Sequence, residues 1–286
     1  MPAETHGLIS ELNIRHCRLS KSYRAIAAFI ETRYDRVPTM TATALAREVG
    51  VSESTVVRFA NALGYEGYPA LLKALQYQVR KRLTTDERFS LGAELPQEDI
   101  LETVLKEDMR NIHRTIELID REAFDQTVNA LLGARHIYIL GLRSAAPLAQ
   151  FMTYYLNFIF DNVSQVSTGL ADVFEGLLRI QPEDVLIGIS FPRYSTRTVE
   201  AMRYAHSAGA RVIAITDSVH SPLNHEADLC LTASTEMPSF VDSRAAPLSL
   251  INALIVALGL KKRDELHQHL TRLEEVWSRN SVYLRK

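Results

Sequence analysis

The first third of the chain carries apolar side chains at helical spacing, separated by short polar breaks. Ile26, Phe29, Ile30 and Tyr34 recur every three or four residues and predict a helix that begins near residue 22. The stretch 20–82 contains no convincing strand pattern, so this part of the chain is expected to be all-α. The same reasoning predicts three further helices, over residues 41–49, 53–63 and 69–83.

Turn signals lie between the second and third of these helices. Gly50 stops one helix, and Ser52 is a good N-cap for the next, which Gly64 ends. Ala46 is small enough to let the two helices approach closely, and Val51 fills the corner between them. This arrangement predicts a helix-turn-helix.

The second helix of such a pair presents its N-terminal end to the major groove of DNA. Val56, Phe59 and Leu63 bury one face of this helix, and polar residues remain on the other. The polar face could instead be the solvated side of a plain three-helix bundle. If it binds DNA, the contacting residues are expected to be Thr41, Ser52, Glu53, Ser54, Thr55 and Arg58.

The pattern changes after residue 136, where short, nearly continuous apolar runs alternate with helical segments. Such alternation predicts a parallel sheet with helices on both faces. The expected strands are 136–142, 163–167, 184–190, 211–217 and 228–233. The expected helices are 100–120, 122–132, 145–160, 170–180, 196–208, 245–260 and 264–276.

Residues 84–98 lose the helical pattern and contain Thr, Ser, Gly and Pro, so we interpret them as a linker. The predicted fold is therefore an all-α helix-turn-helix domain over residues 1–83 followed by an α/β domain over residues 99–286. In the second domain a parallel sheet is sandwiched by helices.

Charge is divided unequally between these parts. Residues 1–82 carry 12 Lys and Arg against 7 Asp and Glu, whereas residues 83–286 carry 20 against 27. The N-terminal part has a net charge of +5 and the remainder −7. A basic helical domain is suited to the phosphate backbone of double-stranded DNA.

Composition is that of an ordinary soluble globular protein, since 47% of residues are hydrophobic and 23% are charged. Disordered, collagen-like and disulfide-scaffold chains are thereby excluded. Cys17 and Cys230 form no metal-ligand or disulfide pattern and fit a reducing cytosol. The N-terminus lacks a signal-peptide pattern, and the apolar stretch 248–260 is too short to cross a bilayer. We expect a cytoplasmic protein with no membrane partner.

Hydroxyl-rich turns follow two of the predicted strands and lead into helices. Helix N-termini bind phosphate readily, and open α/β sheets place ligands at the carboxyl ends of their strands. The chain lacks GxGxxG and GxxxxGK[ST], so neither a dinucleotide cofactor nor an NTPase is expected, and no cofactor is predicted. The candidate ligand-binding residues are Arg143, Ser144, Ser190, Arg193, Ser195 and Thr196.

These segments resemble transcriptional regulators of the RpiR/MurR family, which join a helix-turn-helix to a SIS (sugar isomerase) domain. The resemblance covers about residues 20–280. It rests on ATALAREVGVSESTVVRFANALGYEGYPALLKAL, HIYILGLRSA, DVLIGISFPRYSTRTVEA, VIAITDSVHSPL and ADLCLTA. It implies a SIS-type fold and a regulator of carbohydrate metabolism whose affinity for a DNA operator responds to a phosphosugar or related anionic sugar.

The resemblance also implies roles for single residues. Ser144 matches the serine of the first phosphate turn, and Ser190 and Ser195 match the first and last hydroxyls of the family's SxSGxT segment. Pro192 and Arg193 depart from this pattern, because they stand where Ser-Gly is usual. One phosphate-binding hydroxyl is therefore missing, and Arg193 could replace it with a charge-assisted contact.

The chain gives little sign of catalysis. His267 and His269 are two residues apart, which points them to different sides of a helix, so no metal site is expected. Glu175, Glu200 and Glu226 have no paired base signature, and no catalytic residue is predicted.

Three hypotheses follow. The first is a regulator, not an enzyme, that binds operator DNA as a homodimer or homotetramer assembled through the SIS domain. The second is a sugar-phosphate isomerase with an accessory DNA-binding domain. The third is a module for acidic or amino sugars that regulates through protein contacts and needs no DNA.

Overall fold

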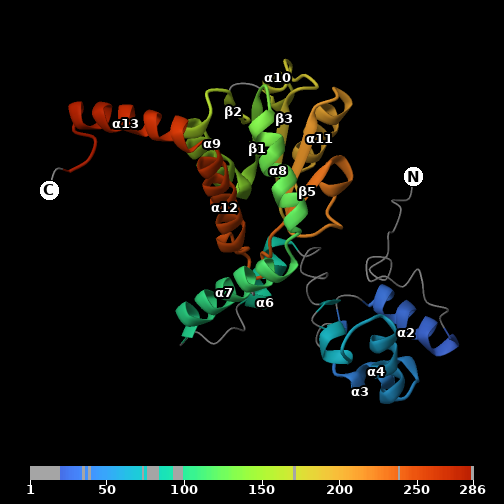
Figure 1. Cartoon of the computed structure of the whole chain (residues 1–286). Helices are drawn as coiled ribbons and strands as arrows, with labels where there is room; N and C mark the ends of the chain where they lie inside the picture. The colour runs from blue at the N-terminus through green and yellow to red at the C-terminus, as the bar shows by residue number, and fades with distance from the viewer. Residues whose placement is uncertain are drawn as a thin grey trace. The chain divides into compact units, whose positions relative to one another are not determined.

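A computed structural model describes residues 20–33, 36–37, 40–72, 74–75, 84–92, 99–169, 172–237 and 239–284. The chain divides into two compact units, Met1–Glu94 and Leu95–Lys286, which we call the N-terminal unit and the C-terminal unit (Figure 1). Cys17, Tyr34 and the end of the helix expected over 69–83 lie outside the described residues.

The N-terminal unit is helical throughout its described part. Its elements are α2 (Lys21–Thr32), α3 (Ala42–Val49), α4 (Glu53–Ala62), a helical stretch over 68–72 and 74–75, and α6 (Thr85–Gly92). The predicted caps are confirmed: the Thr55 backbone N–H donates to Ser52 Oγ at 3.2 Å, and Gly50 adopts a φ of 74°. Ile26, Val56 and Phe59 are fully buried in the core between the helices.

Helix α6 lies inside the segment that we interpreted as a linker. Thr84 and Glu87 explain it, because they form reciprocal capping hydrogen bonds. The Glu87 N–H donates to Thr84 Oγ1 at 3.3 Å, and the Thr84 N–H donates to Glu87 Oε2 at 2.7 Å. This capping box starts a helix even though the segment has a weak apolar pattern.

The C-terminal unit contains the predicted five-stranded sheet, in which all neighbouring strands are parallel. The strands are β1 (Ile137–Gly141), β2 (Val163–Val166), β3 (Val185–Ile189), β4 (Arg211–Thr216) and β5 (Leu229–Thr232), in the spatial order β2-β1-β3-β4-β5. The helices are α7 (Ile100–Leu118), α8 (Arg121–Gly133), α9 (Ala146–Ile159), α10 (Val173–Gly176), α11 (Thr196–Ser207), α12 (Ala245–Lys261) and α13 (Arg263–Arg279), with short 3₁₀ turns η4 (Arg143–Ala145) and η5 (Asn224–Glu226).

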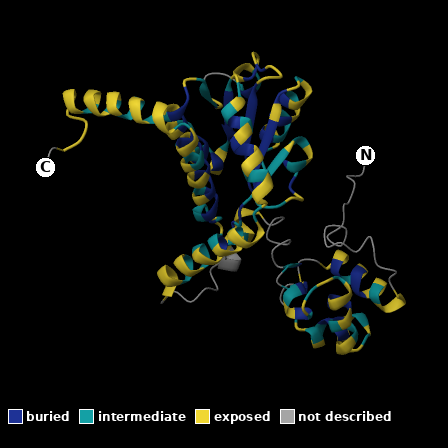
Figure 2. Cartoon of the chain, viewed as in Figure 1, coloured by how far each residue is buried: buried dark blue, intermediate teal, exposed yellow. Residues whose placement is uncertain are grey.

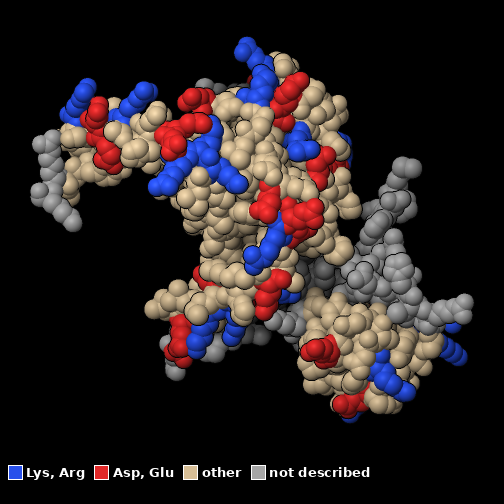
Figure 3. Space-filling view, viewed as in Figure 1, with Lys and Arg blue, Asp and Glu red and all other residues tan. Residues whose placement is uncertain are grey.

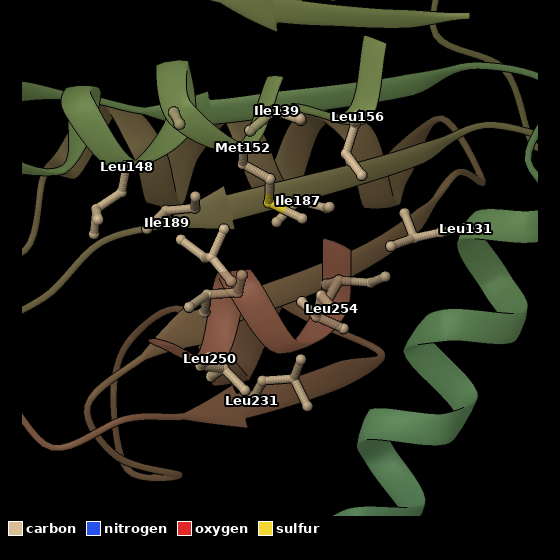
Figure 4. Close-up of a cluster of buried hydrophobic side chains, with 14 of the residues drawn as sticks. Leu131, Ile139, Leu148, Met152, Leu156, Ile187, Ile189, Leu231, Leu250 and Leu254 are labelled. Carbon is tan, nitrogen blue, oxygen red and sulfur yellow. The ribbon is translucent and has the colours of Figure 1, made fainter. Parts of the chain in front are cut away.

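Helices cover both faces of this sheet (Figure 1). Ile139 and Ile187 point to one face, where α8, α9 and α12 pack and Met152 and Leu254 are fully buried (Figure 4). The alternate strand residues point to the other face, which α10 and α11 cover. Because both faces are covered, the strands are apolar along most of their length, as the sequence indicated.

The helix expected over 170–180 is wrong in extent, because only Val173–Gly176 is helical in that described stretch. Asp172 caps this turn by accepting the Phe174 N–H at 3.2 Å. Gly176 then lies against the sheet, where an added Cβ would meet Val166 Cγ1 at 3.1 Å. The Leu177 and Leu178 N–H groups then donate to the carbonyls three residues earlier, so the chain leaves the α-helix after a single turn.

Helix α13 continues from α12 after a bend of 102° and buries none of its residues (Figure 2). Among the described helices, none is both long and apolar enough to cross a membrane alone, although α12 and α13 pass the same test of length and composition as a bent pair.

Candidate functional site

The strand order places the candidate site at the point where the sheet changes winding direction. Strand β1 leads into α9 on one face of the sheet, and the neighbouring β3 leads into α11 on the opposite face. Open α/β sheets commonly bind ligands beside two such strands, where the loops that follow them diverge. Both predicted hydroxyl-rich turns lie at this edge.

The turn after β1 has an unusual backbone. Arg143 has a φ of 55°, in the left-handed region that non-glycine residues rarely adopt. Ser144 follows within η4 and is exposed, and α9 begins only at Ala146 without a side-chain hydrogen bond at its N-cap. Ser144 thus lies beside the cap and does not fill it. The Ala145 and Ala146 N–H groups donate to the Leu142 and Arg143 carbonyls, and Pro147 has no N–H, so the start of α9 offers few free donors.

The turn after β3 brings two predicted residues together. Ser190 Oγ accepts the Ser195 N–H at 3.1 Å, and Ser195 Oγ caps α11 by accepting the Thr198 N–H at 3.3 Å. Thr196 and Arg193 are exposed on this turn. The turn is therefore closed by its own two serines.

A tyrosine ties this turn to the next strand end. The Tyr194 hydroxyl donates to Asp217 Oδ1 at 2.6 Å, immediately after β4. In the first turn of α11, the fully buried Thr198 Oγ1 has no hydrogen-bond partner. The Asp217 carboxylate and the Tyr194 hydroxyl thus lie beside the turn after β3.

Arg244 joins the two turns and was missed in the sequence. Its Nη2 donates to Ser144 Oγ at 3.1 Å, and its guanidinium carbon lies 4.7 Å from the centre of the Phe191 ring. It also pairs with Asp242 at 3.5 Å, and its side chain is only 21% exposed. In the sequence, Arg244 is recognisable only as a cation just before the apolar stretch of α12, and it lies a hundred residues from Ser144. The edge therefore carries a fixed guanidinium between two hydroxyl turns.

In the N-terminal unit, most of the predicted DNA-contacting residues lie at the N-terminal end of α4, and Thr41 lies at the start of α3. Glu53 Oε2 accepts from the Thr43 hydroxyl at 2.7 Å, and Ser52 Oγ lies 2.9 Å from Ser54 Oγ. Arg58 Nε donates to the Ser54 carbonyl at 3.2 Å. Thr41 caps α3 by accepting the Ala44 N–H at 3.1 Å. Ser52, Glu53, Ser54 and Arg58 are exposed together on one end of α4.

The segment after α4 turns through Gly64 and Gly67, whose φ values are 87° and 81°, and two further hydrogen bonds hold it. The Gly67 N–H donates to Asn61 Oδ1 at 2.9 Å, and the buried Tyr68 hydroxyl donates to the Met40 carbonyl at 3.0 Å. Burial raises the pKa of Tyr68 to about 12, so this hydroxyl stays a donor. These contacts fix α4 against the rest of the unit.

The other residues weighed for catalysis have structural partners or lie apart. Glu226 pairs with Arg203 at 2.7 Å, and Glu200 pairs with Arg197 at 3.3 Å. Within the described residues, no group of three His, Cys, Asp or Glu side chains could hold a metal ion. Acidic and basic side chains are interspersed over the C-terminal unit on the face drawn in Figure 3.

Comparison with known proteins agrees with this division of the chain. Residues 6–82 match the helix-turn-helix domain of the rpiR family, and residues 130–257 match the SIS domain. An uncharacterized HTH-type transcriptional regulator from Haemophilus influenzae is 26% identical over 271 residues, which cover 92% of this chain and 93% of that protein. The regulator HexR from Pseudomonas aeruginosa is 25% identical, over 94% of this chain and 95% of its own length.

Two solved structures share the fold. The sugar isomerase domain of an RpiR transcription factor from Sphaerobacter thermophilus matches with a TM-score of 0.60 and 25% identity, over 62% of this chain and 99% of that one. NanR from Vibrio vulnificus, complexed with ManNAc-6P, matches with a TM-score of 0.58 and 23% identity, over 94% and 97% of the two chains.

The helix-turn-helix unit and the α/β unit together define a transcriptional regulator that carries a sugar-isomerase-type domain. The chain belongs to the RpiR family of these regulators.

Proposed function

We propose that this protein regulates genes of carbohydrate metabolism by binding operator DNA with an affinity that a phosphosugar, or a related anionic sugar, controls. The observation that carries the proposal is the edge where Arg244 bridges the turns after β1 and β3. The N-terminus of α11, hydroxyls and a guanidinium meet there, and these are the groups that bind a phosphate. The ManNAc-6P complex of NanR is consistent with this ligand class.

In this proposal each predicted residue of the two turns has a role toward the ligand. Ser144, Ser190 and Ser195 offer hydroxyls, and the Thr196 N–H lies in the first turn of α11. Arg143 and Arg193 add positive charge at the exposed rim of the two turns. The Tyr194–Asp217 pair would face the sugar hydroxyls.

The polar end of α4 would read the operator. Arg58 would exchange its hydrogen bond to the Ser54 carbonyl for one to a guanine edge or a phosphate. Ser52, Ser54 and Thr55 would contact the sugar-phosphate backbone of the DNA. Glu53 would accept from a cytosine amino group, and Thr41 would contact a phosphate beside the N-terminus of α3.

A second copy of the chain completes the proposal, because helix-turn-helix proteins read two half-sites spaced by about 34–36 Å. The C-terminal unit offers apolar surface for this assembly. Leu101 and Met109 on α7 are 72% and 70% exposed. An apolar groove of about 710 Å³ also lies between α9, α12 and α13, where Leu260 is 69% exposed. We propose a homodimer or homotetramer formed through this unit, acting in the cytoplasm and without enzymatic turnover.

Two measurements, made one after the other, test the proposal. Thermal-shift screening with phosphosugars and sugar acids identifies the ligand, because a ligand of the native state raises the apparent melting temperature. Gel shifts with genomic fragments, with and without that ligand, then test control of DNA binding. A ligand that leaves every operator affinity unchanged would refute control, and turnover of a phosphosugar in a chromatographic assay would support the isomerase hypothesis instead.

Arg58 offers a sharper test of the DNA contact. Arg58→Ala should weaken operator binding, and Arg58→Lys distinguishes the kind of contact, because lysine keeps the charge but cannot form the planar bidentate pair. If Arg58 reads a guanine, the Arg58→Lys variant keeps general DNA affinity and loses preference for the operator. Operator affinity unchanged in Arg58→Ala at physiological salt would contradict the role.

A further inference from the structure

The segment that follows β5 is bound to α7 and ends at the site edge, where Arg244 lies. We call residues 233–237 and 239–244 the strap. Asn111, which is 2% exposed in α7, holds it: Asn111 Nδ2 donates to the Glu236 carbonyl at 2.6 Å, and Asn111 Oδ1 accepts the Glu236 N–H at 3.0 Å and the Ser234 hydroxyl at 2.7 Å. The Ser234 N–H donates to Thr115 Oγ1 at 3.0 Å. The buried Asn111 amide therefore bonds both the N–H and the carbonyl of one strap residue, Glu236, as a neighbouring β-strand would.

A second attachment lies at the other end of the strap. The Ser243 hydroxyl donates to Asp108 Oδ1 of α7 at 2.5 Å, and Ser243 Oγ accepts the Ala245 N–H at 3.3 Å. Ser243 is 4% exposed. This hydroxyl links α7 directly to the first residue of α12.

The residue after Ser243 is Arg244, whose guanidinium contacts Ser144 and Phe191 in the two turns. One short stretch of backbone therefore carries the guanidinium at the candidate anion site and the hydroxyl bonded to α7. Helix α7 is the first helix of the C-terminal unit, and in sequence it comes directly after the division from the DNA-binding unit.

We propose that the strap transmits anion binding at the turns after β1 and β3 to α7, with Arg244 sensing the anion and the Ser243–Asp108 hydrogen bond passing the change on. The inference rests on the proposed function, because it needs an anion at that edge. It adds the route by which occupancy of the site changes the part of the chain that leads to the DNA-binding unit.

The physical basis is competition for one guanidinium. Arg244 donates to the neutral Ser144 hydroxyl and to the Ser243 carbonyl, and it pairs with Asp242. A phosphate offers oxygens that form stronger charge-assisted hydrogen bonds, so it draws Arg244 from these partners and fixes it. Because Ser243 is the preceding residue, the change reaches Asp108 through the backbone. A ligand shifts an equilibrium only by binding its two states unequally, and the exchange of Arg244 partners provides that difference.

Hydrogen exchange of the full chain, with inorganic phosphate as the probe and chloride at equal ionic strength as the reference, tests the route. In the wild type we expect phosphate to slow exchange several-fold both in the turn at 190–198 and in α7. Asp108→Ala should keep the slowing at 190–198 and lose it in α7. Asp108→Asn is the matched control, because its side-chain carbonyl still accepts the Ser243 hydroxyl, and it should behave like the wild type. Arg244→Gln should weaken both effects.

The outcomes separate the route from the site. If α7 slows equally in Asp108→Ala and the wild type, or does not respond although 190–198 does, the coupling is refuted and the anion site stands. If phosphate leaves 190–198 unchanged in the wild type, the anion site is refuted and the coupling with it. The loss in Asp108→Ala together with its rescue in Asp108→Asn supports the route, since general destabilisation would not distinguish these two variants in this way.

Discussion

Replacing Ser195 by alanine removes one hydroxyl that serves both stability and the proposed ligand contact. In the ligand-free protein Ser195 Oγ accepts the Thr198 N–H, while the Ser195 N–H donates to Ser190 Oγ. Alanine keeps this second hydrogen bond, because the backbone N–H remains. The turn should therefore stay closed, and Ser195→Ala isolates the loss of a single oxygen.

The two consequences differ in size. Loss of an N-cap costs about 1 kcal/mol of stability, within a range of roughly 0.5–2 kcal/mol. A hydrogen bond to a charged phosphate contributes about 1.5–3 kcal/mol, so ligand affinity should fall roughly 10- to 150-fold. The expected loss of ligand-binding free energy is therefore larger than the expected loss of folding stability.

Calorimetric titration with the identified phosphosugar measures the affinity, and urea unfolding measures the stability. Trp277 is the single tryptophan and lies in α13, so its fluorescence follows the C-terminal unit. Asp120→Ala is the matched control, because Asp120 caps α8 by accepting the Ala123 N–H at 3.0 Å and lies outside both turns. It should lose about the same stability and keep full ligand affinity. Unchanged affinity in Ser195→Ala, or an equal fall in both variants, would refute the reasoning.

Two substitutions and one chemical modification test the packing and the chemistry of the chain further. Gly188→Ala should destabilise the C-terminal unit by about 1–3 kcal/mol in urea unfolding, because the new Cβ would overlap the buried Met202 side chain and lie 2.8 Å from its Cγ. Gly50→Ala should lower the folding stability of the N-terminal unit by about 1–2 kcal/mol because of the φ of 74°, since nothing lies within 4 Å of the added Cβ. Faster hydrogen exchange over residues 42–62 would show this loss. Cys230 has its pKa raised to about 11, by burial and then by Asp217, so its thiol stays protonated and should resist iodoacetamide at pH 8 until urea unfolds the protein; equal alkylation of native and unfolded chains would contradict this.

The elements that sequence analysis predicted correctly are those with a strong local signal. Gly50 and Ser52 fix the turn between α3 and α4 through backbone conformation and a cap, and both act within a few residues. The strands are recognisable because both faces of the sheet are covered, which makes runs such as 185–189 almost wholly apolar. Their order in the sheet depends on the crossover connections, which apolar periodicity does not record.

The elements that were misjudged depend on distant partners or on caps. The stretch around Val173 has helical apolar spacing, yet the N–H groups after Gly176 bond three residues back, so only one α-helical turn forms. The capping box of Thr84 and Glu87 is a local signal, but the residues around it have no apolar periodicity to mark the helix. Arg244 could not be assigned, because its contact with Ser144 joins residues a hundred positions apart.

The departure from the family's second phosphate motif can now be interpreted in terms of charge. Pro192 and Arg193 replace the usual Ser-Gly, yet Ser190 and Ser195 still close the turn at 3.1 Å, so the missing hydroxyl is not needed for its shape. Guanidinium groups lie in or beside both turns, at Arg143, Arg193 and Arg244. In the proposed site, cations in place of a neutral hydroxyl would favour the charge of the ligand over hydrogen-bond geometry. The net charge of −7 over residues 83–286 does not oppose this, because field strength at a ligand depends on the nearest charges and on helix N-termini, while more distant surface charges are screened by salt.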